Sequence, residues 1–152
     1  MKKLFAVILT VALLMSLSVT AFAANTTGGD ADITTSIAPT YTVTIPADVN
    51  VQFNATETAF GAIEVTASQI HPDKCIKVAL ATDKELNNAI DNTKVIPYAI
   101  KDSEGAAFTS ATYLTEGDKT ELSIHITADD WNAAYAGDYS DIVTFTVSYE
   151  DK

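Results

Sequence analysis

The last stretch of the chain places the strongest constraint on its fold, because apolar and polar residues alternate there. From Tyr139 to Tyr149 the odd positions are mostly apolar and the even positions are mostly Ser or Thr. Alternate side chains of a β-strand leave opposite faces, and β-branched and aromatic residues suit a half-buried sheet. Asp141 and Ile142 break the alternation, which indicates a β-bulge. We predict a strand that buries Val143, Phe145, Val147 and Tyr149.

Shorter alternating segments recur before this stretch, separated by turn signals. The clearest are 41–45, 76–80 and 122–126, and Val49, Val51 and Phe53 indicate another short strand. Residues 127–131 predict a capped helical turn, and 83–92 are compatible with a further helical turn. No long amphipathic helix separates the strands, which disfavours a parallel sheet. We therefore predict an all-β fold, an antiparallel β-sandwich.

The first 23 residues predict a secretory signal peptide. Lys2 and Lys3 precede an almost wholly apolar run over 4–14, and Ala-Phe-Ala at 21–23 has the small-x-small form of a cleavage site. The apolar run is shorter than the roughly 20 residues that a membrane span needs. We expect cleavage after Ala23, a secreted or cell-surface location, and no membrane insertion of the mature chain.

The rest of the chain has the length of one domain, and its charge limits the partners that it can bind. We expect a flexible N-terminal extension at 24–40, which is rich in small polar residues, and a sandwich domain at 41–152. All 20 acidic residues follow residue 23, and arginine is absent. Such a surface repels phosphate, so we expect no nucleic-acid partner.

Alternation begins before the first firm strand. Apart from Thr35, apolar residues occupy the odd positions from 33 to 45, with Thr, Ser or Ala between them, and Pro39 interrupts the pattern. One interpretation is a ragged start to the first strand, because proline is tolerated at a strand end. Another is a segment that adds itself as an edge strand to a second sheet. The candidate strand-exchange residues are Ile33, Ile37, Tyr41, Val43 and Ile45.

The end of the chain also resembles a known kind of protein. Residues 136–149, which Gly137 opens and Tyr149 closes, are similar to the terminal strand of immunoglobulin-like pilus and spore-coat-U-type bacterial subunits. The alternating segment 33–45 resembles the extension with which such subunits complete a neighbour's sheet. The resemblance implies an immunoglobulin-like sandwich of about seven to nine strands in a non-catalytic surface subunit.

Catalysis and metal binding find little support in the sequence. His71 and His125 are isolated, and no H-x-H, HExxH or cysteine pair accompanies them, since Cys75 is the single cysteine. A Ser-His-Asp set is assembled in space, so a small secreted hydrolase is kept as a third alternative. We assign no catalytic residue, metal ligand or cofactor.

One group of aromatic residues suggests a different function. Trp131, Tyr135 and Tyr139 are spaced four residues apart, so the first two would share a side of a helical turn and could form a glycan platform. The other interpretation is a tryptophan that closes one end of the sandwich. We predict a structural or adhesive subunit of a cell surface or matrix, with self-association or other surface proteins as partners. A carbohydrate-binding module is the alternative.

Overall fold

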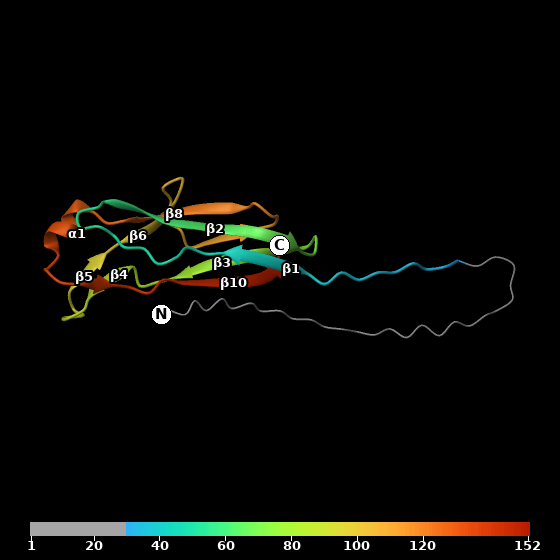
Figure 1. Cartoon of the computed structure of the whole chain (residues 1–152), viewed down its shortest axis with the longest axis horizontal. Helices are drawn as coiled ribbons and strands as arrows, with labels where there is room; N and C mark the ends of the chain where they lie inside the picture. The colour runs from blue at the N-terminus through green and yellow to red at the C-terminus, as the bar shows by residue number, and fades with distance from the viewer. Residues whose placement is uncertain (1–29) are drawn as a thin grey trace, which may run out of the picture. The chain divides into compact units, whose positions relative to one another are not determined.

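The computed structural model describes residues 30–152, and the predicted signal peptide lies outside this range. Residues 36–152 form one compact unit. Within the described range no helix has the length and apolar character to cross a membrane. The elements, labelled in Figure 1, are β1 (Thr40–Thr44), β2 (Glu57–Gln69), β3 (Lys74–Ala81), β4 (Glu85–Asn88), β5 (Val95–Pro97), β6 (Ala99–Asp102), β7 (Ser110–Tyr113), β8 (Lys119–His125), α1 (Ala128–Ala133), β9 (Tyr139–Ser140) and β10 (Thr144–Asp151).

Two layers of antiparallel strands face each other, which confirms the predicted all-β sandwich. The first layer is a sheet of order β1-β2-β8-β6, and the second contains a sheet of order β10-β3-β7. A small sheet of order β5-β4-β9 lies toward α1 (Figure 1). Every strand pairing in the described chain is antiparallel.

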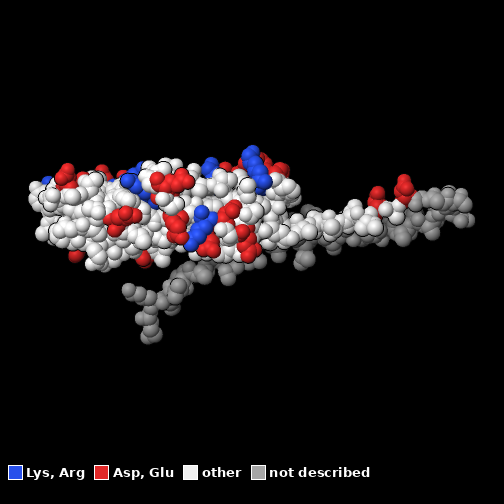
Figure 2. All heavy atoms as spheres, turned by 90° about the horizontal axis from the view of Figure 1, so that it is seen from above, with Lys and Arg blue, Asp and Glu red and all other residues white. Residues whose placement is uncertain are grey.

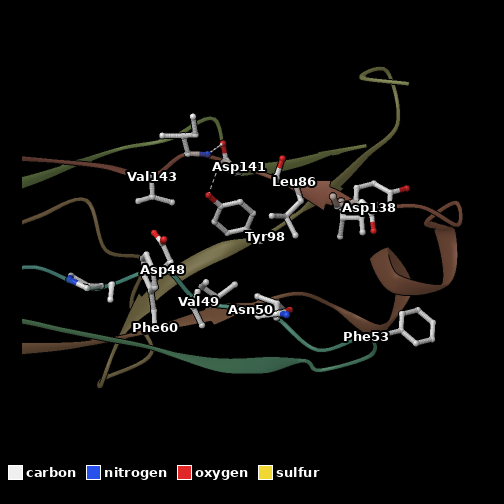
Figure 3. Close-up of a pocket in the computed structure, with 18 of the residues that line it drawn as sticks. Asp48, Val49, Asn50, Phe53, Phe60, Leu86, Tyr98, Asp138, Asp141 and Val143 are labelled. Carbon is white, nitrogen blue, oxygen red and sulfur yellow. Dashed lines mark hydrogen bonds between the residues drawn. The ribbon is translucent and has the colours of Figure 1, made fainter. Parts of the chain in front are cut away.

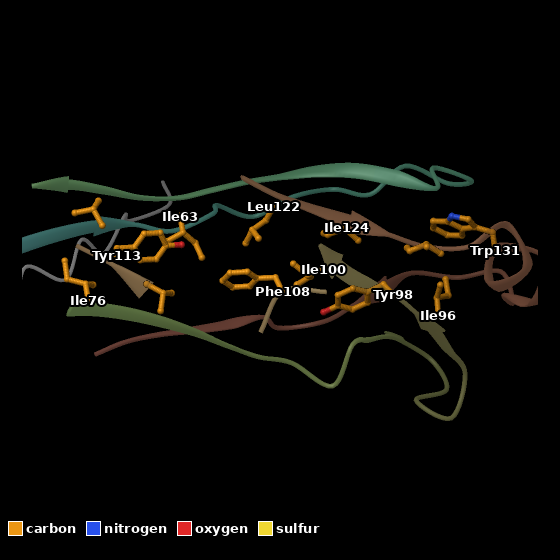
Figure 4. Close-up of a cluster of buried hydrophobic side chains, with 13 residues drawn as sticks. Ile63, Ile76, Ile96, Tyr98, Ile100, Phe108, Tyr113, Leu122, Ile124 and Trp131 are labelled. Atoms are coloured by element: carbon orange, nitrogen blue, oxygen red, sulfur yellow. The ribbon is translucent and has the colours of Figure 1, made fainter. Parts of the chain in front are cut away.

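The core lies between the layers and follows the period of two that the sequence shows (Figure 4). Ile63 and Val65 of β2 face Ile76 and Val78 of β3, and all four side chains have no exposed surface. Burying each such side chain contributes roughly 1.5–3 kcal/mol to stability. These alternating pairs therefore hold the two layers together.

Trp131 of α1 closes one end of the core. Its side chain is 9% exposed, and its Nε1 donates a hydrogen bond to the carbonyl oxygen of Ala55 at 2.9 Å. Thr127 caps the helix, because its Oγ1 accepts from the backbone N–H of Asp130 at 3.1 Å. The predicted capped turn is thus present, and the β2–β3 turn forms the opposite end of the sandwich.

Six strands follow the order of an immunoglobulin-type sandwich, whereas β7 and the small sheet of β5, β4 and β9 lie outside its seven-strand form. In such a fold strands A, B, E and D form one sheet, and G, F and C form the other. Here β1, β2, β8 and β6 take the places of A, B, E and D, while β10 and β3 take those of F and C. Among residues 30–152, no strand occupies the place of G beside the outer edge of β10.

The closing stretch differs from the prediction in its course. It forms two strands, β9 and β10, which join different sheets, with Asp141 and Ile142 at the switch between them. Only one neighbour, β3, covers β10, so its apolar side chains are half-buried rather than buried, and Val147 is 38% exposed.

Two other segments also differ from expectation. Residues 49–53 alternate like a strand but form none, and Glu85–Asn88 is β4 rather than a helical turn. The first segment diverges from β2 after β1 ends, so it has no ladder partner. The second pairs with β5 and β9, which favours the extended form.

Candidate functional site

A groove of about 850 Å³ opens along the side of the sandwich where β1 and β10 lie (Figure 3). Residues 45–53 form its first wall, and residues 137–145 form the second. Its floor is largely apolar and consists of Phe60, Leu86, Ile96, Tyr98, Ile124 and Trp131. The groove therefore reaches the sandwich interior between two segments that belong to different layers.

The first wall has apolar side chains at alternate positions but no strand partner. Ile45 is 44% exposed and Val49 is 38% exposed. Pro46 lies against the face of Gly61 that carries no side chain. In the described chain, the β1 ladder ends at Thr44, and residues 47–51 make no backbone hydrogen bond to another backbone group. This wall is a strand-like segment whose backbone groups are free to pair.

The second wall continues beyond residue 145 into the outer edge of β10. Val147 of β10 pairs directly with Val78 of β3, so the two side chains share the inward face. Val78 has no exposed surface, whereas Val147 is 38% exposed. The difference arises because β3 has a strand on each side and β10 has one on a single side. Inward-facing apolar surface is therefore open to solvent along this edge.

Asp141 fixes the second wall at the point where the chain passes from β9 to β10. Its Oδ2 accepts hydrogen bonds from the hydroxyls of Tyr98 and Thr82, the latter at 2.8 Å. Its Oδ1 accepts from the backbone N–H of Ile142 at 2.6 Å. Burial raises the pKa of Asp141, but these hydrogen bonds outweigh burial and lower the pKa below its ordinary value. Burial, and then the Asp141 carboxylate, raise the pKa of Tyr98.

The groove is acidic at its rim. Among the described residues that line it, the charged ones are Asp48, Asp138 and Asp141. Acidic and basic side chains are interspersed on the face of the sandwich that Figure 2 shows. A segment that enters the groove should therefore be apolar and free of negative charge along the inserted part.

The five candidate strand-exchange residues lie in three different parts of the structure. Tyr41 and Val43 lie in β1 and pair with β2, and Tyr41 stacks on Tyr149 of β10 at 5.8 Å between ring centroids. Ile45 belongs to the first wall of the groove. Residues 30–39 form no strand, and Ile33 and Ile37 are 98% and 62% exposed.

The three aromatic candidates for a glycan platform do not share one surface. Trp131 faces the core, and Tyr139 is half-buried, with its hydroxyl donating to the carbonyl oxygen of Tyr135 at 3.0 Å. Tyr135 is 64% exposed, and the Lys94 ammonium lies 5.0 Å from its ring centroid. Sequence reasoning missed Phe53, which is 75% exposed and packs edge-on against Trp131 at 5.6 Å. Its place at the end of the alternating 49–53 segment was the available signal.

The two histidines lie at opposite ends of β2, in the β2–β3 turn and beside Glu57. His125 Nε2 is 2.9 Å from Ser123 Oγ and 3.9 Å from Glu57 Oε1. A hydrolytic triad uses different ring nitrogens for the serine and the acid, whereas both contacts here involve the same one. Across residues 30–152, no three His, Cys, Asp or Glu side chains gather in a way that could hold a metal ion.

Comparisons with known proteins add little to this geometry. No protein-family model matches the chain, and no curated protein matches it. One similar solved structure is described as a chaperone–tip adhesin complex vital for synergistic activation of CFA/I fimbriae biogenesis. The similarity has a TM-score of 0.47 at 10% sequence identity, over 71% of this chain and 42% of that chain. The present chain thus spans less than half of the protein that it resembles.

Proposed function

We propose that this protein is a secreted, non-catalytic structural or adhesive subunit of a bacterial surface or matrix that assembles by strand addition. Residues 33–39 of one copy enter the groove between residues 45–53 and 137–145 of the next copy and continue along the edge of β10 as far as Val147. The inserted segment takes the place of strand G and pairs with the free edge of β10.

The exposure of Val147 is the observation that carries this proposal. An inward-facing valine that is 38% exposed, beside a partner with no exposed surface, marks a core that one more strand would cover. A free strand edge flanked by apolar side chains can pair with another chain and cause aggregation, so proteins ordinarily cover such an edge or protect it with charged residues or proline. An added strand would cover this edge and remove the hazard.

The segment 33–39 has the apolar character and the lack of charge that the groove requires. Ile33 and Ile37 are exposed and share a face in an extended chain, and no charged residue lies between them. Asp30 and Asp32 precede the segment and would stay clear of the acidic rim. At roughly 3.3 Å per residue the extended segment spans about 23 Å, the length of seven strand residues.

Light scattering on four proteins tests this function. The chain from Ala24 should form assemblies, whereas the same chain lacking 24–39 should be a folded monomer. Ile33→Asn with Ile37→Asn should also give a monomer, because both inserted side chains become polar. Thr34→Asn with Ser36→Asn is the matched control, which should still assemble because these side chains point away from the groove. If all four proteins are monomers, the proposal is wrong.

A synthetic peptide of residues 30–39 provides an independent measurement. Added to the truncated monomer at a hundred times its dissociation constant, it should raise the free energy of unfolding by about 2.7 kcal/mol through binding to the native state. A peptide with asparagine in place of Ile33 and Ile37 should leave the thermal transition unchanged. Equal effects of the two peptides would contradict insertion of the isoleucine side chains.

A further inference from the structure

Strand addition, if it occurs as proposed above, determines which ends of two copies must meet. Strand β10 runs toward the β2–β3 turn, since Asp151 pairs with Lys74 and the N–H of Lys152 donates to the carbonyl of Asp73. Antiparallel pairing is the more stable arrangement. An inserted segment that is antiparallel to β10 and reaches Val147 with Ile33 therefore has Pro39 opposite Asp141, toward the α1 end of the acceptor.

The inserted segment is joined directly to its own subunit, without a linker. Strand β1 begins at Thr40, directly after Pro39, and Thr40 pairs with Gln69 beside the β2–β3 turn. No linker residue is available to separate the two bodies. The β2–β3 turn of the donor must consequently contact the α1 end of the acceptor.

Both ends offer apolar surface at the required place. On the acceptor, Phe53 lies in the groove wall near α1 and is 75% exposed. On the donor, a notch of about 220 Å³ is lined by Ile37, Pro39, Gln69, Ile70, His71 and Pro72. When Ile37 leaves this notch to enter the groove, its position beside Ile70 becomes vacant.

We propose that Phe53 of the acceptor copy packs against Ile70 and Pro72 of the donor copy, in the place that Ile37 leaves. The occupant is a second copy of this chain, and the contact continues the one made in the groove. It joins two different surfaces, so repetition extends a linear filament rather than closing a dimer. A large aromatic residue in an apolar recess is typical of the side chains that dominate interface affinity.

Disulfide trapping tests this contact separately from strand addition. In the full chain with Cys75→Ala, which removes the buried native thiol, Phe53→Cys with Pro72→Cys should give a ladder of covalent oligomers on mild oxidation. Glu104→Cys with Pro72→Cys is the control and should give no ladder, because Glu104 lines neither the groove nor the notch. Assemblies that form normally by light scattering but yield no Phe53→Cys/Pro72→Cys ladder would overturn the Phe53 contact and leave strand addition intact. Failure of the parent chain to assemble would overturn both.

The variant Phe53→Ala gives a second, non-covalent measurement. We expect self-association to weaken about tenfold or more, as for other truncated aromatic anchors. Phe53→Trp, which keeps a large apolar ring, should restore most of the loss. Unchanged self-association in Phe53→Ala would contradict the contact.

Discussion

The two long sides of the sandwich differ in whether the chain closes the gap between the layers. On the side of β6 and β7 the chain itself crosses between the layers and places Phe108, which is 4% exposed, into the gap. The N–H of Phe108 donates to the carbonyl of Ile100 at 2.9 Å, and that of Leu80 donates to the carbonyl of Thr109 at 2.8 Å. On the side of β1 and β10 the layers meet through the Tyr41–Tyr149 stack, and the groove lies open beyond it.

This difference shows that one sandwich can have a covered core on one side and an edge open to an added strand on the other. The closed side satisfies the backbone and fills the core with residues that are close in sequence. The open side has a groove with a wall that makes no ladder, and beside it a free strand edge with an inward-facing, exposed valine. Substitutions on the closed side should therefore affect folding, whereas substitutions on the open side should affect association.

The largest expected difference in stability is between a phenylalanine-to-alanine substitution on the closed side and the same substitution on the open side. Phe108→Ala should lower the free energy of unfolding by about 3–5 kcal/mol, because it leaves a cavity at a buried position. Phe53→Ala should lower it by less than about 1 kcal/mol, since the side chain is exposed and loses only its contact with Trp131. Urea unfolding of the truncated monomer, followed by tryptophan fluorescence, measures both. Equal losses would mean that the two sides do not differ as described.

The second contrast concerns the carboxylate that fixes the wall of the groove. Asp141→Asn should cost about 1.5–3 kcal/mol at neutral pH, the range for hydrogen bonds to a charged group. The folded protein holds the pKa of Asp141 below its ordinary value, so this stability is present above the unfolded pKa and is lost as pH falls through the folded pKa. The difference between parent and variant should therefore shrink below about pH 4.

Asp48→Asn, on the opposite wall, is the control for this measurement. Asp48 is an exposed carboxylate, so its replacement should change the free energy of unfolding by no more than about 0.5 kcal/mol. Urea midpoints recorded between neutral and acidic pH give the comparison. A pH-independent difference for Asp141→Asn would show that its charge does not contribute.

The sequence predicted the covered parts of the fold better than the open ones, for a physical reason. Alternation identifies residues that face a core, and where strands lie on both sides, as for Val78, those residues are fully buried. Alternation says nothing about whether a neighbour covers the edge, so Val147 and Tyr149 were expected to be buried although β10 has a single partner. Residues 49–53 carry the same pattern without a ladder. The groove and the open edge of β10 beside it arise from these two deviations, so both became visible only in three dimensions.

Val147→Thr should have the smallest effect on the stability of the monomer, and it tests most directly whether the open side of the sandwich is a binding site. Val147→Thr keeps the β-branched shape and the strand preference, and the side chain already contacts solvent, so the free energy of unfolding should change by about 0.5 kcal/mol or less. In the assembled protein the same side chain would be buried under the inserted strand, and a hydroxyl there would weaken association about tenfold. Leu114→Thr is the matched control, because Leu114 is 42% exposed and lies in the turn after β7. It should leave both quantities nearly unchanged. If Val147→Thr destabilises the monomer and leaves association unaffected, then β10 is an ordinary covered strand and the open side is not a binding site.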